Sequence, residues 1–340
     1  MGGSESVTVA SAEYHDIQII LSGLGTVTPL ATVTVKSQIS GYLTQVAFTE
    51  GQLVHKGDLL AQVDPRPYQV LLDQYEGTLA KDQALLDNAR LDLKRYQILA
   101  RQDSISGQTV DTQAATVRQY EGAVRTDRGL VEAQKLNLVY CRITSPIDGR
   151  VGLRQVDIGN YVEASDTTGI AVVTEVAPIS VIFVLPEDCV PQLRARMREG
   201  AKLPVTAYDR SNTTKIAEGK LSAIDSQFDT STGTLKLRAI FPNTDDALFP
   251  NQFVNARLLL DTVHDAITVP LAAMQNGADG KMVYVVDDGN KVHMRKIQTG
   301  VADTERVAVT AGLKAGERVV IDGANRLQDG ATVSIAQAGS

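Results

Sequence analysis

The chain has 340 residues, enough for two or three domains, and 43% of them are apolar, enough to bury several cores. The formal net charge of −7 and the lack of a basic patch with interleaved aromatic residues argue against a nucleic-acid partner. No apolar run reaches the roughly 18 residues that a membrane-spanning helix needs. Met1-Gly2-Gly3-Ser4 lacks the charged start and apolar core of a signal peptide, so we expect an added tag on a shortened or mature chain that has lost its natural signal or anchor.

The first predicted elements are strands between Val7 and Val35, where apolar residues alternate and Gly23, Gly25 and Pro29 interrupt the pattern. The sequence offers no repeat of these strands with which they could pair. We therefore expect them to complete β domains formed by the later part of the chain.

A short β motif then occurs twice. The segments 37–43 and 145–151 both read Ser-x-Ile-x-Gly-x-aliphatic, with their glycines at Gly41 and Gly149. A further glycine follows ten residues later in each copy, at Gly51 and Gly159, and an aspartate follows at the same offset in both, at positions 58 and 166. Two copies of one unit, held about a hundred residues apart, predict two halves of a single small domain and an insertion between them.

The insertion has the heptad period of a coiled coil. Its first apolar seam opens after Asp64-Pro65-Arg66-Pro67, is broken only by Asp82, and comprises Leu72, Tyr75, Leu79, Leu86, Ala89, Leu93, Tyr96 and Ala100. The residues of a second seam are Val110, Ala114, Val117, Val124, Val131 and Leu138. This seam is weaker, because polar residues occupy three of its heptad positions: Glu121, Arg128 and Lys135. Helices of about 33 residues are roughly 50 Å long. They predict an antiparallel hairpin that projects as an arm, because it is too long to pack down on a domain of about 70 residues.

Strands predominate after the second half-motif. We expect a strand over 179–185, a short helix around 186–199 ended by Gly200, and strands over 204–208, 217–225, 233–241 and 252–260, which indicate a small barrel or sandwich. A last block, 266–336, contains further short strands. The predicted fold is mainly β with an α-helical coiled-coil hairpin, in an elongated multidomain chain.

No pattern in the chain supports catalysis. The four histidines are scattered, Cys141 and Cys189 lie far apart without a CxxC motif, and no nucleophile elbow, phosphate-binding loop or dinucleotide-binding motif occurs. We therefore predict no metal, no cofactor and no enzymatic activity. Two non-enzymatic classes remain, a swinging carrier and a structural adaptor.

The duplicated unit itself resembles the lipoyl or biotinyl carrier fold, in which the turn between the halves displays a modified lysine. Here the helical insertion takes the place of that turn, and Lys56 lies in a different one. The carrier alternative therefore lacks its working residue.

Four features together resemble the periplasmic adaptors, or membrane fusion proteins, of tripartite efflux pumps, and they cover nearly the whole chain. The first is the split motif with its helical hairpin, and the second is the pattern Arg-x3-Leu-x6-Ser at the hairpin tip. The third is Asp229–Thr234 followed by Arg238-Ala239 and Phe241-Pro242-Asn243, and the fourth is Val269-Pro270 followed by Ala272-Ala273. The segment 250–254 has Asn251 where many members have glycine, which resembles the MdtA-type subgroup of adaptors for resistance-nodulation-division (RND) transporters.

The resemblance implies a domain order. It assigns 7–34 to N-terminal strands that complete the membrane-proximal and barrel domains, 35–66 and 140–175 to the halves of a lipoyl-like domain, 67–139 to the hairpin, 176–262 to a β-barrel, and 263–336 to a membrane-proximal domain.

It also implies a docking site for an outer-membrane channel, made by Arg95, Leu99 and Ser106 at the hairpin tip. Arg95 and Leu99 lie one helical turn apart, so they share a face that offers a guanidinium group and an apolar side chain. Ser106 follows in the turn, where it suits a helix cap or a bond to a partner backbone.

The function implied is that of a periplasmic adaptor, associated with the inner membrane, that links an RND transporter to an outer-membrane channel of the TolC type. The resemblance implies six adaptor copies per pump, which form a sealed conduit for drug export in Gram-negative bacteria and so contribute to antibiotic resistance. An adaptor of an ABC-type or other exporter is the alternative, because the arm and lipoyl parts are shared among those systems. The sequence does not identify the exported compounds.

Overall fold

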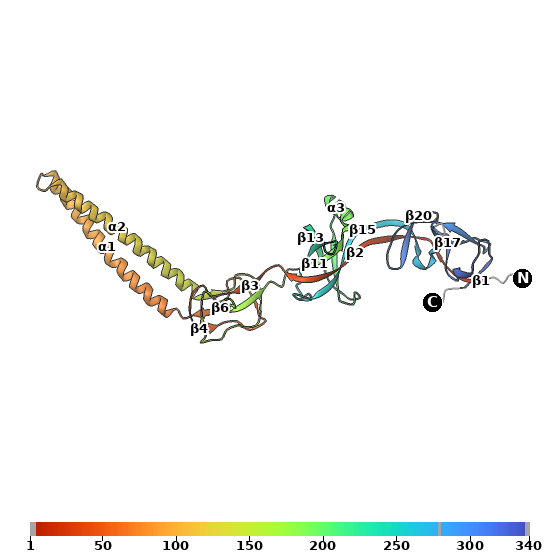
Figure 1. Cartoon of the computed structure of the whole chain (residues 1–340), viewed down its shortest axis with the longest axis horizontal. Helices are drawn as coiled ribbons and strands as arrows, with labels where there is room; N and C mark the ends of the chain where they lie inside the picture. The colour runs from red at the N-terminus through yellow and green to blue at the C-terminus, as the bar shows by residue number, and fades with distance from the viewer. Residues whose placement is uncertain (1–4, 278–279, 337–340) are drawn as a thin grey trace. The chain divides into compact units, whose positions relative to one another are not determined.

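The computed structural model describes residues 5–277 and 280–336, so the expected tag at Met1–Ser4 lies outside the described residues. The chain divides into two compact units, Pro29–Val176 and the pair of segments Met1–Thr28 and Ala177–Ser340. The fold is mainly β with one helical hairpin, as the sequence predicts (Figure 1). Within the described residues, no helix combines the length and the apolar character that a membrane crossing requires.

The β part of the unit Pro29–Val176 contains two four-stranded sheets, in the orders β3-β10-β8-β5 and β7-β6-β4-β9. The strands are β3 (Thr32–Val35), β4 (Gly41–Val46), β5 (Leu53–Val54), β6 (Leu59–Val63), β7 (Arg142–Thr144), β8 (Gly149–Val151), β9 (Tyr161–Val162) and β10 (Ala171–Thr174). Each sheet takes its two outer strands from one half of the repeat and its two inner strands from the other. Neither half forms a sheet alone, so the two copies make one domain.

Equivalent residues of the two copies make the same local bonds. The hydroxyl of Ser37 donates to the carbonyl of Ile39, and that of Ser145 donates to the carbonyl of Ile147 at 2.7 Å. The carboxylates of the two equivalent aspartates each accept a backbone N–H three residues earlier at 2.8 Å, in the pairs His55–Asp58 and Glu163–Asp166. The sequence repeat therefore encodes the same turns, held by the same hydrogen bonds, in both halves.

The repeated glycines serve two different needs. Gly51 and Gly159 have φ of +77° and +91°, a region that side chains with a Cβ avoid. A Cβ on Gly41 would lie 2.6 Å from Cγ1 of Val63, and one on Gly149 would lie 2.4 Å from the carbonyl oxygen of Thr174. The first glycine of each copy permits close packing, and the second permits a turn.

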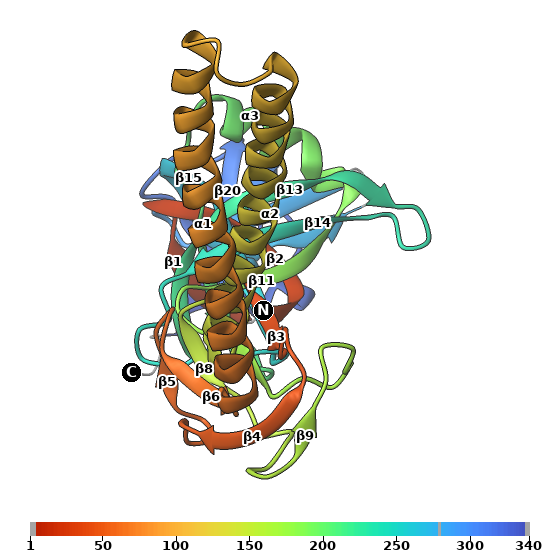
Figure 2. The same cartoon turned by 90° about the vertical axis from the view of Figure 1, so that its left-hand side faces the viewer.

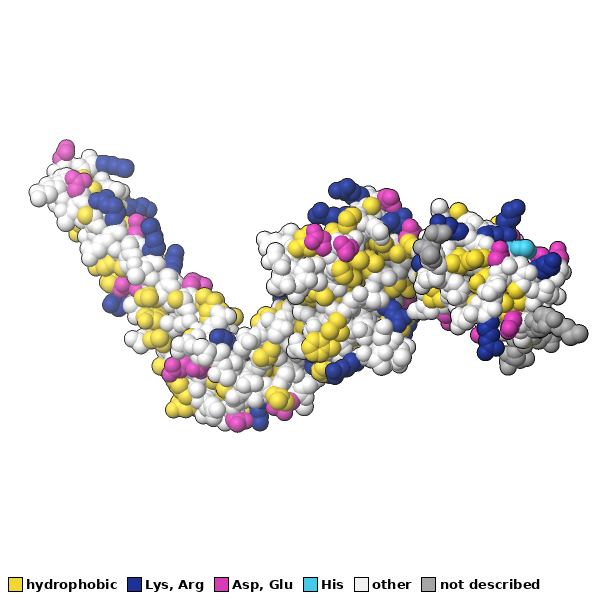
Figure 3. Space-filling model, turned by 45° about the vertical axis from the view of Figure 1, so that its right-hand side comes forward, with side chains coloured by type: hydrophobic (Ala, Val, Ile, Leu, Met, Phe, Trp, Pro, Cys, Tyr) yellow, Lys and Arg dark blue, Asp and Glu magenta, His cyan; other side chains and the backbone are white. Residues whose placement is uncertain are grey.

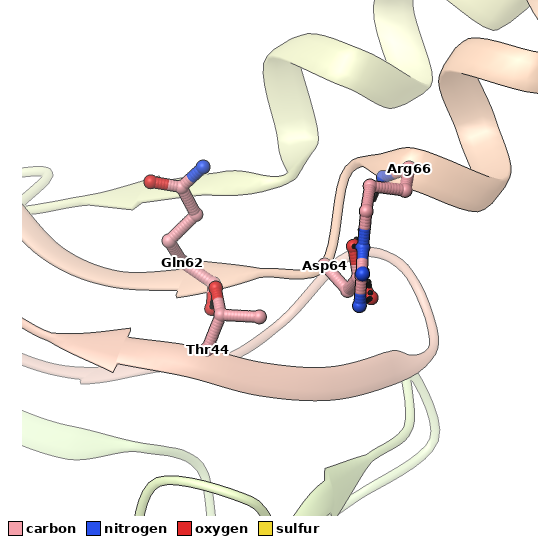
Figure 4. Close-up of polar contacts among 4 residues, drawn as sticks. All are labelled: Thr44, Gln62, Asp64 and Arg66. Atoms are coloured by element: carbon pink, nitrogen blue, oxygen red, sulfur yellow. Dashed lines mark hydrogen bonds and ion pairs between the residues drawn. The ribbon is translucent and has the colours of Figure 1, made fainter.

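The hairpin consists of α1 (Arg66–Arg101) and α2 (Gly107–Tyr140), which run side by side (Figure 2). At the base of α1 the carboxylate of Asp64 accepts hydrogen bonds from the backbone N–H and the guanidinium group of Arg66 (Figure 4). These bonds hold the pKa of Asp64 below its usual value. On the adjoining strands, the hydroxyl of Thr44 donates to the carbonyl of Gln62 at 3.1 Å (Figure 4).

The structure corrects one column of the predicted seam on α2. Tyr120, Asp127 and Gln134 are buried or half-buried there, and Asp127 is only 9% exposed. Glu121 and Arg128, which the sequence pattern places in the seam, lie instead along its edge, as does Lys135. Glu121 pairs with Arg90 at 2.7 Å, and Arg128 donates to Gln83 at 3.2 Å. The column of Val117, Val124 and Val131 is buried as predicted.

The second unit contains an eight-stranded sheet in the order β12-β13-β14-β11-β2-β15-β20-β19, in which β12 also pairs with β15 and so closes a barrel. Its strands are β2 (Glu13–Pro29), β11 (Ile179–Pro186), β12 (Pro204–Tyr208), β13 (Lys215–Asp229), β14 (Thr234–Phe241), β15 (Phe253–Pro270), β19 (Gln298–Ala302) and β20 (Arg306–Ala311). Phe183 and Phe241 are fully buried in the barrel core, and Leu193 from α3 (Val190–Arg198) packs there as well.

A second sheet in this unit has the order β16-β17-β21-β1-β22, with β18 paired to β17. Its strands are β1 (Glu5–Ser11), β16 (Gln275–Gly277), β17 (Gly280–Val286), β18 (Val292–Lys296), β21 (Arg318–Asp322) and β22 (Val333–Ile335). The long strands β2 and β15 pair along most of their length and connect the barrel to β19 and β20. The N-terminal strands β1 and β2 thus belong to the two different sheets.

Two motifs singled out in the sequence are turns of the barrel. Asp229 accepts from the backbone N–H of Ser231 at 3.0 Å in the turn between β13 and β14, where Gly233 has a φ of +65°. Asn251, where the resemblance leads us to expect glycine, also has a φ of +65°. Asparagine is among the few residues other than glycine that adopt this conformation readily. The replacement thus preserves the turn.

Candidate functional site: the tip of the helical hairpin

The tip closes through a Schellman motif at the end of α1. The backbone N–H of Ser104 donates to the carbonyl of Leu99 at 3.0 Å, and that of Asp103 donates to the carbonyl of Ala100 at 3.1 Å. Asp103 adopts a φ of +49°, the left-handed conformation that this motif requires. The backbone of Leu99 therefore organises the turn, while its side chain stays 38% exposed.

Arg95 lies one turn before Leu99 on α1, and its side chain is 70% exposed. Its Nη1 donates to the carboxylate of Asp92 at 3.1 Å, in an ion pair along the helix surface. An exposed pair of this kind contributes only about 0–1 kcal/mol to stability. The fold thus gains little from Arg95, and the guanidinium retains donors for another molecule.

Ser106 is the N-cap of α2. Its Oγ accepts from the backbone N–H of Thr109 at 3.3 Å and lies 3.0 Å from the hydroxyl of Thr109. A hollow of about 350 Å³ beside it is lined by Tyr96, Ser106, Gln108, Thr109, Thr112 and Gln113. These side chains carry hydroxyl and amide groups and no charge, so the hollow suits hydrogen bonds with the backbone or the side chains of a partner.

Sequence reasoning missed the threonines and glutamines that surround Ser106. Gln113 also donates to the carbonyl of Ala89 at 3.0 Å and so ties α2 to α1 just below the tip. The usable signal was the position of Thr109 three residues after the N-cap, where a side chain commonly meets the capping residue. The structure places Arg95 and Leu99 on α1 and Ser106 at the start of α2, at one end of the hairpin.

The carrier alternative requires a modified lysine in a turn that joins the two halves. The halves are joined by α1 and α2, whereas Lys56 lies in the exposed turn between β5 and β6. The backbone N–H of Lys56 donates to the carboxylate of Asp148 at 2.9 Å, which ties this turn to the other half.

Three family models match the chain in succession and together span most of it. Residues 31–174 match the barrel-sandwich hybrid domain of RND membrane fusion proteins, 178–262 match their β-barrel domain, and 265–326 match their C-terminal permuted SH3 domain. All three models describe RND systems, and nothing in the comparisons favours an ABC-type exporter.

Curated relatives include multidrug resistance protein MdtA of Yersinia enterocolitica, 51% identical over 333 residues that cover 97% of this chain and 75% of the relative. MdtA of Yersinia pseudotuberculosis is 50% identical over the same shares.

Among solved structures, MacA from Actinobacillus actinomycetemcomitans has the same fold, with a TM-score of 0.58 and 24% identity over 92% of this chain and 98% of that one. A MacA–MexA chimera that carries the α-hairpin of Pseudomonas aeruginosa MexA has a TM-score of 0.57 and 26% identity over 91% of this chain and 99% of its own. The chain therefore belongs to the RND membrane fusion proteins and, within them, to the MdtA type.

Proposed function

We propose that this chain is the periplasmic adaptor of a multidrug efflux pump, linking an inner-membrane RND transporter to an outer-membrane channel of the TolC type. The observation that carries the proposal is the identity of 51% to a multidrug resistance protein along 97% of the chain. The transporter supplies the energy for export, so the adaptor contributes binding surfaces and a conduit rather than a reaction.

The hairpin tip is the part of the chain that we assign to the channel. Leu99 offers an apolar side chain that is already partly exposed, and Arg95 offers donors for carboxylates or backbone carbonyls. Ser106 and the neutral hollow beside it add hydrogen-bonding groups. A rigid tip of this kind loses little conformational entropy on docking, because the capped turn is already formed.

Several copies of the adaptor, six in the proposed pump, surround one path across the periplasm. Their hairpins stand next to one another and meet the channel at their tips. The β domains seat on the transporter, which leaves the adaptor associated with the inner membrane.

The test is capture of both partners after mild crosslinking. The parent chain should co-purify with an RND transporter and a TolC-type channel. The variants Leu99→Asp and Arg95→Asp should lose the channel and drug resistance while keeping the transporter. Their melting temperatures should stay close to that of the parent, because Arg95 is largely exposed and Leu99 is partly exposed.

Gln97→Asp is the matched control, since Gln97 is exposed on the same helix but on the face opposite to Arg95 and Leu99. It should keep both partners. Retention of the channel by both tip variants would reject the assignment of the tip. Failure of the parent chain to capture either partner would reject the adaptor function.

A further inference from the structure

The β part of the unit Pro29–Val176 has a hollow between its two sheets. The strand β3 is the last strand of one sheet, and β7 is the last strand of the other. A hollow of about 350 Å³ is lined by residues of both strands and by the end of α2. The internal repeat relates its two walls, because positions 34, 36 and 38 of the first half correspond to 142, 144 and 146 of the second.

The edge of β3 that faces this hollow offers backbone hydrogen-bonding groups. The carbonyl of Val172 accepts from the backbone N–H of Gly152 at 2.8 Å, so the backbone groups of Val172 face β8. Thr34 lies opposite Val172 on β3, in a pair that exchanges no hydrogen bonds. The N–H and C=O of Thr34 therefore point away from β10. No strand pairs with this edge of β3 in the part of the chain that the structure describes.

The edge of β7 is also open, but it has fewer donors. Cys141 and Ser145 bond to β6 at 2.9 Å, through the carbonyl of the first and the N–H of the second. Arg142 and Thr144 alternate with them, so their backbone groups point away from β6. Pro146 has no N–H, whereas the equivalent glutamine of the first half keeps its own. The edge of β3 is thus better suited to pair with another strand, and β7 forms the opposite wall.

The side chains around the hollow make it positive, although the chain as a whole is acidic. Lys36 and Arg142 are exposed there, and neither forms an ion pair within residues 5–277 and 280–336. None of the described residues that line the hollow is acidic, and Thr34, Gln38 and Thr144 add neutral polar groups. On the face that Figure 3 shows, Lys and Arg side chains gather along the hairpin and are few on the β part of the same unit.

We propose that this hollow binds an extended acidic peptide segment of a partner protein, which adds as a strand to the edge of β3. Backbone hydrogen bonds to the edge supply affinity, and the two cations select a segment with carboxylates. The site lies at the base of the hairpin, at the end opposite to the tip. The proposal therefore goes beyond the adaptor function and does not depend on the channel or the transporter.

The experiment is fluorescence anisotropy of a labelled peptide, Asp-Val-Thr-Val-Glu, titrated with the purified chain. The peptide should bind, and binding should weaken as salt is added. It should also slow the exchange of the Thr34 amide. Two matched peptides should not bind. One has lysine in place of both acidic residues, and the other is N-methylated at two successive residues, which removes a backbone donor on each side of the strand.

Substitutions on β3 separate strand addition from folding. Thr34→Pro removes the outward N–H but leaves the bonds to β10, and proline is tolerated on an edge strand in this position. It should abolish peptide binding. Thr32→Pro is the matched control, because Thr32 is on the same strand with the same orientation but does not line the hollow. It should bind the peptide as the parent does.

The two cations are tested separately. Lys36→Ala and Arg142→Ala should each weaken binding about threefold, the range for an exposed ion pair, and together about tenfold. Both side chains are exposed, so the melting temperature should not change. Equal binding of the acidic and the lysine peptides would contradict the selection by charge.

Absence of binding by the parent chain would overturn the proposal, as would binding that survives Thr34→Pro. Displacement of the peptide by an equal concentration of citrate would identify a site for small anions instead. A parent chain that is dimeric without peptide, and monomeric after Thr34→Pro, would assign the edge to a second copy and so also overturn it. The assay contains neither a transporter nor a channel, so its failure leaves the adaptor function untouched, and failure of the capture experiment leaves this site untouched.

Discussion

Gly149 shows how a single repeated residue constrains the barrel-sandwich hybrid domain. A Cβ there would lie 2.4 Å from the carbonyl oxygen of Thr174 and 2.7 Å from its carbonyl carbon. Both are backbone atoms of the neighbouring strand, so they cannot turn aside as a flexible side chain would. The sequence repeat identifies this glycine, but only the pairing of β8 with β10 explains it.

Gly149→Ala is therefore expected to lower the free energy of unfolding by about 1–3 kcal/mol, the range for overpacking a close contact. Urea denaturation of the unit that contains the hairpin would measure the change. Gly152→Ala is the matched control, because a Cβ at Gly152 lies 3.4 Å from its nearest neighbour, an ordinary contact. It should be neutral or stabilising by up to about 1 kcal/mol. Equal losses in both variants would refute the steric explanation.

At the scale of a whole helix, the seam of α2 shows where sequence reasoning succeeds and where it stops. Three valines at seven-residue spacing, Val117, Val124 and Val131, determine one buried column without ambiguity. The sequence does not determine the second column of the seam in the same way. Asp127 and Gln134, which the structure buries or half-buries, are no more apolar than Arg128 and Lys135, which follow them. Only the orientation of α1 decides which set is buried, and that orientation is a property of the packed pair.

Prediction of the tip from the sequence has the same limit. The Arg-x3-Leu-x6-Ser spacing identifies three residues, and the helix boundary at Ser106 follows from its capping side chain. The hollow beside Ser106 depends on Tyr96 as well as on residues of α2. No local pattern in the sequence joins residues across the turn in this way, because the closure by Asp103 determines how the two helices meet.

The corrected seam contains an acidic layer that weakens the hairpin. Asp127 is buried, and its Oδ2 has no hydrogen-bond partner among the residues that the structure describes. Asp82, the one polar residue in the predicted seam of α1, falls at the same level, since its neighbour Gln83 bonds to Arg128. A buried polar atom without a partner loses its hydration and gains nothing in return.

Asp127→Leu should therefore stabilise the hairpin by about 1–3 kcal/mol, because leucine has a similar branched shape and no polar atoms. Amide exchange along α1 and α2 would show the gain as slower opening. Asp127→Asn, which keeps the shape and removes only the charge, should give a smaller effect. Faster exchange in the leucine variant would mean that the carboxylate has a stabilising role in the folded hairpin.

At the scale of the whole molecule, the helical hairpin is inserted between two strands of a β domain, β6 and β7, that a short turn could join directly. The strands β6 and β7 are antiparallel neighbours, and the backbone N–H of Val63 donates to the carbonyl of Cys141 at 2.9 Å. The two ends of the insertion thus lie side by side. Each sheet is already completed by strands from the two halves, so its hydrogen bonds do not depend on α1 or α2.

Replacing residues 64–140 with Asn-Gly, a favoured two-residue hairpin turn, should consequently leave the β domain folded. The domain should lose some stability, because Tyr68, Leu138 and Tyr140 pack against its core. Circular dichroism should show the loss of the helical signal, while amides of β6 and β7 stay protected from exchange. In the capture experiment the shortened chain should keep the transporter and lose the channel. Exchange of the β6 and β7 amides at the rate of an unfolded chain would show that the hairpin is required for folding. Capture of the channel without the hairpin would instead place the docking surface on the β domains.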